Sequence, residues 1–312
     1  AKAGFINFFL KKDFIFDNIQ QVLNLNESYG NNKSGKNKNI NVEFVSANPT
    51  GPIHIAHMRG AVLGDVISSI LESNGYNVTR EYYVNDAGTQ IHSLGNSLFK
   101  RYQELFNIKV DILENEYPGN YLIPIAKIIA DNDKEKWLNH DEIERKHYFE
   151  KYAVNILINN IKDDLTSINV NFDNFIYESE IVKNNLIEKI FSLLKKKNLI
   201  YEGFLEKPKG EDNKNWQPRK QLLFKASSFF DDKDRALKKE DGEWTYFAND
   251  SAYHYDKFSR NFDQLINIWG ADHIGYIDRM KSIISAFSNK DNYLEVCVCQ
   301  IVRLLSDGKL IK

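Results

Sequence analysis

The chain has 312 residues, of which 42% are hydrophobic and 27% are charged, as in soluble globular proteins and unlike disordered ones. Lys and Arg number 41 against 43 Asp and Glu, so the net charge of −2 excludes a globally basic surface for nucleic acid. Two cysteines exclude a disulfide scaffold, and no apolar run approaches the roughly 18 residues that cross a bilayer. We therefore expect a cytoplasmic protein without a membrane partner.

The first 39 residues predict a small N-terminal segment. Residues 5–10 predict a short strand, and apolar residues at helical spacing between 14 and 23 predict an amphipathic helix. The stretch 29–39, YGNNKSGKNKN, is polar and without periodicity, which is typical of a linker. Because the chain begins with Ala and stops shortly after a Ser-Asp-Gly turn, we expect it to be a fragment, with a domain boundary between 39 and 40.

A parallel crossover unit is predicted next. Residues 42–45 predict a strand, and the loop SANPTGP at 46–52 contains prolines that oppose an early helix. Apolar residues on one face of 55–71 predict a helix that ends before Gly75, and 78–84 predict a second strand. A strand, loop, helix and strand of this length indicate a parallel pair whose loop lies at the carboxyl end of the first strand.

The rest of the chain predicts a helical middle followed by a second α/β half. Residues 92–200 are mostly helical in pattern, and 203–245 indicate loops and a hairpin. The predicted elements are helices at 142–161 and 181–197, a strand at 265–269, a turn at 270–273, a helix at 276–287 and a strand from 294.

Two histidines at the start of the 55–71 helix carry the first chemical signal. His54 and His57 are three residues apart, so their side chains share one helical face. The unpaired N–H groups and the dipole at a helix N-terminus attract anions, and imidazoles there can donate to phosphate oxygens as charge develops. Such a pair alone is more often structural or half of a metal site. The preceding strand and Pro/Gly loop favour a nucleotide site instead.

Four blocks of the sequence resemble the arginyl branch of the class I aminoacyl-tRNA synthetases. In the family's order they are VEFVSANPTGPIHIAH with MRGAVLGD at 42–65, REYYVNDAGTQI at 80–91, DDKDRALKKEDGEWTYFANDSAYHYDKF at 231–258 and WGADHIGYIDRMK at 269–281. The resemblance covers essentially the whole chain. It implies an α/β fold with a Rossmann-like parallel sheet, a mostly helical insertion at about 105–200, the end of an N-terminal additional domain in 1–39 and the catalytic domain in 40–312. The C-terminal anticodon-binding domain is expected to be absent.

The resemblance also implies which residues form the site. Catalytic roles are expected for His54, His57 and Lys312, the last as the first lysine of a mobile KMSK loop. Arginine contacts are expected from Glu43, Ser46, Asn48, Asp86, Tyr246, Asp250 and His273. ATP contacts are expected from Pro49, Gly51, His54, Ala56, His57, Gly270 and Asp272. A planar guanidinium prefers carboxylates in fork geometry and an aromatic face, which agrees with the arginine set. Ala56 stands where the family signature usually has glycine, which is expected to affect rate rather than identity.

The implied function is ligation of L-arginine to tRNA(Arg) in translation, through an arginyl-adenylate formed from ATP. Mg²⁺ is expected to accompany ATP and pyrophosphate, no metal site formed by the protein alone is expected, and the protein is expected to be a monomer. Residues 1–312 alone are not expected to charge tRNA. One alternative is another nucleotidyltransferase with an H-x-x-H pair, or a class I synthetase for a different amino acid. A second alternative is a degenerate paralogue that binds tRNA or nucleotide without turnover.

Overall fold

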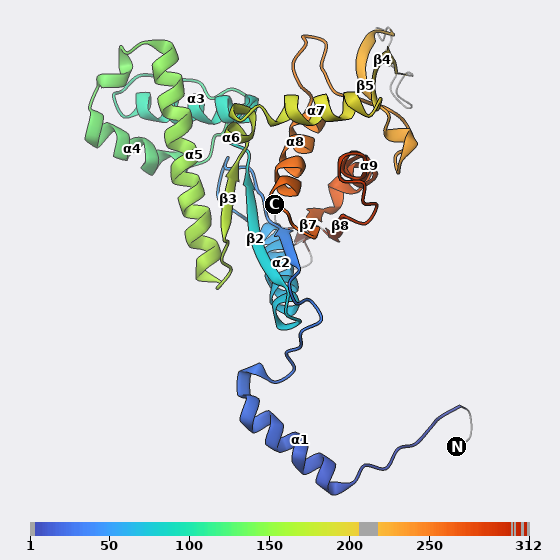
Figure 1. Cartoon of the computed structure of the whole chain (residues 1–312). Helices are drawn as coiled ribbons and strands as arrows, with labels where there is room; N and C mark the ends of the chain where they lie inside the picture. Colours follow the sequence, from blue (N-terminus) through green and yellow to red (C-terminus); the bar gives the residue numbers. More distant parts are fainter. Residues whose placement is uncertain (1–3, 206–217, 301, 303, 307–308, 311–312) are drawn as a thin grey trace.

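The centre of the molecule is a five-stranded, all-parallel sheet with strand order β3-β2-β1-β7-β8 (Figure 1). The computed structural model describes residues 4–205, 218–300, 302, 304–306 and 309–310. The strands of the sheet are β1 (Asn39–Glu43), β2 (Asn77–Val84), β3 (Asn174–Tyr177), β7 (Gln264–Gly270) and β8 (Leu294–Cys299). This parallel sheet with helices confirms the predicted fold class.

Two helices connect neighbouring parallel strands. Helix α2 (Ile55–Ser73) joins β1 to β2, and α9 (Ile277–Ser288) joins β7 to β8. Helix α2 packs closely on the sheet because Gly64 faces Phe44, where a Cβ would lie 2.2 Å from the ring. Gly75 follows the C-cap of α2 with a φ of +84°, the left-handed conformation that glycine adopts without strain.

The strand order reverses between β1 and β7. The chain passes from β1 to β2 in one direction and from β7 to β8 in the other. In open α/β sheets the ligand crevice lies outside the carboxyl ends of the strands at this point. The segments that follow these two strands are 44–54 and the 3-10 helix η4 (Ala271–Tyr276). Both include residues of the predicted site.

A helical block with its own apolar core lies between β2 and β3, to one side of the sheet (Figure 1). It contains α3 (Thr89–Glu104), α4 (Leu122–Asp133), the 3-10 helix η2 (Lys136–Leu138) and α5 (Glu142–Ser167). The block therefore begins at Thr89, before the expected start of the insertion at about 105. It ends at Ser167, before the expected end at about 200. Strand β3, which falls inside that expected range, belongs to the central sheet.

A second group of helices packs together with β7 and β8. It consists of α6 (Glu178–Lys183), α7 (Leu186–Lys196), α8 (Tyr246–Ser259) and α9, whose buried side chains form one core. A small antiparallel sheet of β4 (Ile200–Phe204), β5 (Lys220–Phe224) and β6 (Arg235–Ala236) and the 3-10 helix η3 (Ala226–Ser228) extend it. A two-stranded ribbon, β9 (Leu305–Ser306) and β10 (Lys309–Leu310), follows β8.

Helix α1 (Lys12–Leu25) forms where the amphipathic helix was predicted, and the 3-10 helix η1 (Asn26–Ser28) follows it. No residue of α1 is buried, and Figure 1 shows it apart from the sheet. The strand predicted at 5–10 is wrong, because these residues are exposed and pair with no other strand, and a strand needs a partner for its backbone groups. Among the described residues, no helix is long and apolar enough to cross a membrane.

Candidate active site

The two predicted histidines lie together at the start of α2. His54 is the N-cap residue, and its ring stacks on that of His57 with centroids 3.8 Å apart. The backbone N–H of His54 donates to Nδ1 of His57 at 3.2 Å. Partial burial and the nearby charge of His54 lower the pKa of His57. The pair therefore presents imidazoles beside the unpaired N–H groups of a helix N-terminus, as an anion site requires.

The loop after β1 turns back sharply toward the strand. Val45 and Ser46 adopt left-handed conformations, with φ of 66° and 40°, which are strained for residues other than glycine. The Ser46 hydroxyl donates to Oε1 of Glu43 at 3.0 Å and accepts from the backbone N–H of Tyr83 at 3.1 Å. The strained turn thus places Ser46 between the ends of β1 and β2.

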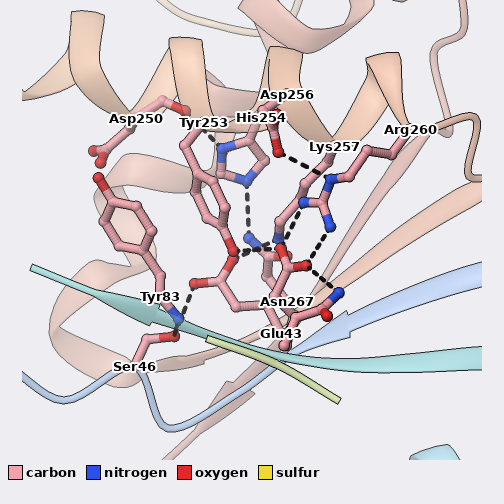
Figure 2. Close-up of polar contacts among 12 residues, drawn as sticks. Glu43, Ser46, Tyr83, Asp250, Tyr253, His254, Asp256, Lys257, Arg260 and Asn267 are labelled. Carbon is pink, nitrogen blue, oxygen red and sulfur yellow. Dashed lines mark hydrogen bonds and ion pairs between the residues drawn. The ribbon is translucent and has the colours of Figure 1, made fainter. Parts of the chain in front are cut away.

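Asp250, on the first turns of α8, lies opposite the loop after β7. The Tyr276 hydroxyl of η4 donates to its Oδ2 at 2.7 Å. Figure 2 shows the Tyr83 hydroxyl pointing toward the same carboxylate, and this buried hydroxyl has no hydrogen-bond partner among the described residues. Burial and the nearby charges of Glu178 and Glu43 raise the pKa of Asp250 to about 7, although the Tyr276 hydrogen bond opposes the shift.

Glu178, at the start of α6, is a second carboxylate of this region that the sequence analysis missed. Its side chain is buried, and Oε1 accepts from Asn249 at 2.9 Å. Burial, together with the charge of Asp86, raises the pKa of Glu178. After burial, the charges of Glu178 and Asp250 are the largest causes of the raised pKa of Tyr83. Neither Glu178 nor Asp250 forms an ion pair with a described residue.

Two further buried carboxylates lie side by side on β1 and β2, where Glu43 is in register with Glu81. Both already have a cation from α8 or from the residue that caps its C-terminus. The ammonium of Lys257 lies 2.6 Å from Oε2 of Glu43. The guanidinium of Arg260 contacts both oxygens of Glu81 at 2.5 and 2.8 Å. Burial alone favours the neutral acid, but the Arg260 hydrogen bonds and the Lys257 charge hold the pKa of Glu81 below its usual value.

The other residues that were predicted to bind arginine lie around this centre and contact other partners. The Asn48 amide donates to Gln90 at 2.8 Å. Asp86 accepts from the backbone N–H and the hydroxyl of Ser179 at 2.9 and 2.6 Å, so it caps α6. Tyr246 is one helical turn before Asp250 on α8, as predicted, but its side chain is 65% exposed. The structure therefore brings together Glu43, Ser46 and Asp250 around Tyr83, and leaves Tyr246 at the rim.

The residues predicted to bind ATP lie in the two segments that follow β1 and β7. Pro49 is buried, Gly51 lies beside the Tyr121 ring, and Ala56 is half-buried in the first turn of α2. Gly270 ends β7, and the exposed Asp272 and His273 follow it in η4 with Oδ2 and Nε2 3.5 Å apart. Lys312 lies outside the described residues.

Metal binding by the protein alone has no candidate in the described part of the chain. No group of three or more His, Cys, Asp or Glu side chains is placed there to hold an ion. Two kinds of ligand group fit the crevice instead. The Asp250 and Glu178 carboxylates suit a cation, and the histidine pair at the N-terminus of α2 suits an anion.

A family model described as tRNA synthetases class I (R), catalytic domain, matches residues 18–292. The chain is similar to proteins named arginine–tRNA ligase over its whole length. It is 45% identical over 312 residues to that of Wolbachia pipientis wMel, covering 54% of that relative. It is 46% identical over 314 residues to that of Orientia tsutsugamushi strain Ikeda, covering 53% of that relative. The chain thus spans about half the length of the curated relatives it matches.

Solved structures give the same result for the fold. A putative arginyl-tRNA synthetase from Campylobacter jejuni superposes with a TM-score of 0.83 at 34% identity, over 97% of this chain and 63% of that one. The Thermus thermophilus arginyl-tRNA synthetase superposes with a TM-score of 0.64 at 18% identity, over 94% of this chain and 52% of that one. The second likeness concerns the fold alone.

Proposed function

Since the chain belongs to the arginine-type class I tRNA synthetases, we propose that it supplies the arginine- and ATP-binding part of an arginine–tRNA ligase. The substrates are L-arginine, ATP and tRNA(Arg). Residues 1–39 are the end of an additional N-terminal domain, and 40–312 belong to the catalytic domain. The protein acts in the cytoplasm as a monomer.

The observation that carries this proposal is the pair of acidic side chains beside Tyr83. Glu178 is buried and Asp250 is half-buried, and neither has an ion-pair partner among the described residues. The unpaired Tyr83 hydroxyl points toward Asp250 (Figure 2), and the charge of Glu178 also acts on it. Burying carboxylates without a cation is costly, so the site is adapted to a ligand that brings one. A guanidinium offers one positive charge and five donors in a plane, which can serve two carboxylates and a phenol together.

In the first step, the arginine carboxylate attacks the α-phosphorus of ATP and pyrophosphate leaves; Mg²⁺ accompanying ATP would neutralise part of the phosphate charge. We assign stabilisation of the developing phosphate charge to His54 and His57, because their imidazoles lie at the N-terminus of α2. Lys312 would hold the leaving pyrophosphate. The amino acid is oriented by Glu43, Ser46, Asn48 and Asp86 at the ends of β1 and β2, and by Tyr246 and His273 at the rim.

ATP extends along the loops that follow β1 and β7. Pro49, Gly51 and Ala56 face the base, and Gly270 allows the ribose to approach the end of β7 while Asp272 accepts from its hydroxyls. In the second step, the terminal ribose hydroxyl of tRNA(Arg) attacks the carbonyl carbon of the arginyl-adenylate, and AMP leaves.

Calorimetric titration of the chain with L-arginine, L-citrulline and L-lysine tests the arginine site directly. Citrulline has nearly the shape of arginine but no charge, so we expect its affinity to be at least about 100-fold lower. ATP–pyrophosphate exchange with tRNA present, tested across amino acids, then identifies the activated one. Preference for another amino acid would identify a synthetase of different specificity. Binding of arginine and ATP without exchange, even when the chain is joined to the remaining half of a relative, would indicate a degenerate paralogue.

A further inference from the structure

Helix α8 is joined to the central sheet by buried charges at one level of three adjacent strands. In the sheet register, Glu43 of β1 lies between Glu81 of β2 and Asn267 of β7. These three polar side chains are fully or almost fully buried. Lys257 of α8 and Arg260, the residue that caps the C-terminus of α8, place a cation on each carboxylate (Figure 2). Because the lysine side chain is 0% exposed, its charge has no access to water.

In the hydrogen bonds around Lys257, the donor and the acceptor of each bond can be assigned in only one way. Its ammonium donates to Glu43 at 2.6 Å and to Oδ1 of Asn267 at 3.3 Å. The Asn267 amide nitrogen can then only donate, and it lies 2.9 Å from Nε2 of His254. His254 is therefore protonated on Nδ1, which donates to the backbone carbonyl of Asp250 at 2.8 Å. Figure 2 shows this series running from the end of β1 to the turn of α8 that carries Asp250.

We propose that Lys257 is a positioning residue for the arginine site: it neutralises Glu43 and, through Asn267 and His254, fixes the turn of α8 that carries Asp250. Lys257 and Asp250 are seven residues apart on one rigid helix, so a shift at the lysine moves the carboxylate as well. The charge of Glu43 is committed to Lys257. Glu43 therefore acts on arginine by holding α8 in place and not by accepting the charge of the guanidinium. This inference rests on the proposed arginine site.

A double-mutant cycle separates this role from direct contact between Glu43 and arginine. Lys257→Met leaves Glu43 buried without a cation, and Glu43→Gln leaves the ammonium buried without an anion. Each single change therefore disturbs the packing of α8 on the sheet. Glu43→Gln with Lys257→Met removes both charges. If the pair acts only by positioning, the double variant binds arginine better than either single variant. If Glu43 contacts the guanidinium, the two losses add and the double variant is the weakest.

The experiment measures the affinities of the 312-residue chain for L-arginine and for ATP by calorimetry. We expect each single change to weaken arginine binding at least tenfold, and the double variant to bind arginine at least about threefold more tightly than either single variant. ATP affinity should change less than twofold throughout. Lys100→Met is the matched control, because Lys100 forms a partly buried ion pair with Glu116 at 2.6 Å in the helical block. It should change neither affinity.

Each remaining outcome has a defined consequence. Arginine affinity that is unchanged in Lys257→Met, or lowest in the double variant, would overturn the positioning role. Parallel loss of arginine and ATP binding would show a general structural effect and would also overturn it. If the unmodified chain binds no arginine, the proposed function itself fails and the inference fails with it.

Discussion

The Tyr276 hydroxyl donates a hydrogen bond to Oδ2 of Asp250 at 2.7 Å, and this bond links α8 to the 3-10 helix that follows β7. Asp250 belongs to the proposed arginine site, whereas η4 also carries Asp272 of the proposed ATP site. One hydrogen bond therefore joins the two halves of the crevice. The orientation of the Asp250 carboxylate therefore depends on the positions of both α8 and η4.

Asp250→Asn tests the charge of the arginine site. The amide keeps the shape of the side chain and the hydrogen bond from Tyr276 but loses the negative charge. We expect arginine binding to weaken by roughly 1.5–3 kcal/mol, the usual range for a charged hydrogen bond, while ATP affinity stays constant. Calorimetric titration of each ligand measures both. Equal weakening of the two would indicate general collapse of the crevice instead.

Arginine affinity should depend on pH through Asp250. Its pKa is about 7 without ligand, because the half-buried side chain is desolvated and lies near the charges of Glu178 and Glu43. The guanidinium binds the ionised form, so below pH 7 binding must release a proton, and affinity should fall up to about tenfold per pH unit. Above pH 8 it should level off. Titrations between pH 5.5 and 8.5 follow this change, which Asp250→Asn should largely remove.

Tyr276→Phe should move this pH dependence in a defined direction. The Tyr276 hydroxyl stabilises the ionised carboxylate and thereby opposes the rise in the pKa of Asp250. Without it, the pKa should rise further, so the pH at which arginine affinity is half lost should increase. The same titrations detect the shift. A midpoint that moves to lower pH would contradict the assignment of the midpoint to Asp250.

His54→Ala tests the anion site at the start of α2. In the proposed first step, the imidazole at the N-terminus of α2 stabilises the charge that develops on phosphate and does not hold arginine, so its loss should affect the transition state. In any form of the protein that supports ATP–pyrophosphate exchange, we expect kcat to fall by about 10²-fold or more, with little change in the arginine KM. A raised KM at unchanged kcat would assign His54 to substrate binding.

His254 should affect the stability of the fold in acid. Burial, and then the charge of Lys257, lower its pKa from 6.5 to about 4. Between pH 6.5 and 4, His254 is therefore protonated in the unfolded chain but not in the folded chain. The stability that His254 contributes above pH 6.5 is lost across this window, by at most roughly 3 kcal/mol.

Urea unfolding at pH 7, 5 and 4 measures this contribution. His254→Gln removes the titrating group, so the stability of the variant relative to the unmodified chain should increase as the pH falls. His147→Gln, at an exposed position of α5, is the control and should follow the unmodified chain. Parallel acid destabilisation in all three proteins would show that His254 does not titrate in this window.

The sequence by itself was sufficient for most of the local elements and for the position of the crevice, although the strand predicted at 5–10 does not form and the helix predicted at 181–197 is divided into α6 and α7. Helical spacing predicted α1, α2, α5 and α9, and the pattern of 42–84 predicted the β1–α2–β2 unit with its loop at a strand end. These predictions succeed because periodicity and turn residues act within a few residues along the chain. The spacing of His54 and His57 at a helix start also predicted the histidine pair, and the resemblance to a family then added the acidic residues, whose individual roles stay predictions.

Only the tertiary structure decided which acidic side chain already has a cation. In the sequence, Glu43 and Asp250 are equal candidates for the guanidinium, and Lys257 is one lysine among many. The fold places Lys257 on Glu43 and leaves Asp250 beside Glu178 without an ion-pair partner among the described residues. Asn267 within an apolar strand, Leu265–Trp269, was the one signal of a buried polar cluster. Within this cluster Lys257 pairs with Glu43, which is 214 positions away. Such pairing is set by the sheet register and by the packing of α8 on the sheet, which spacing along the chain does not encode.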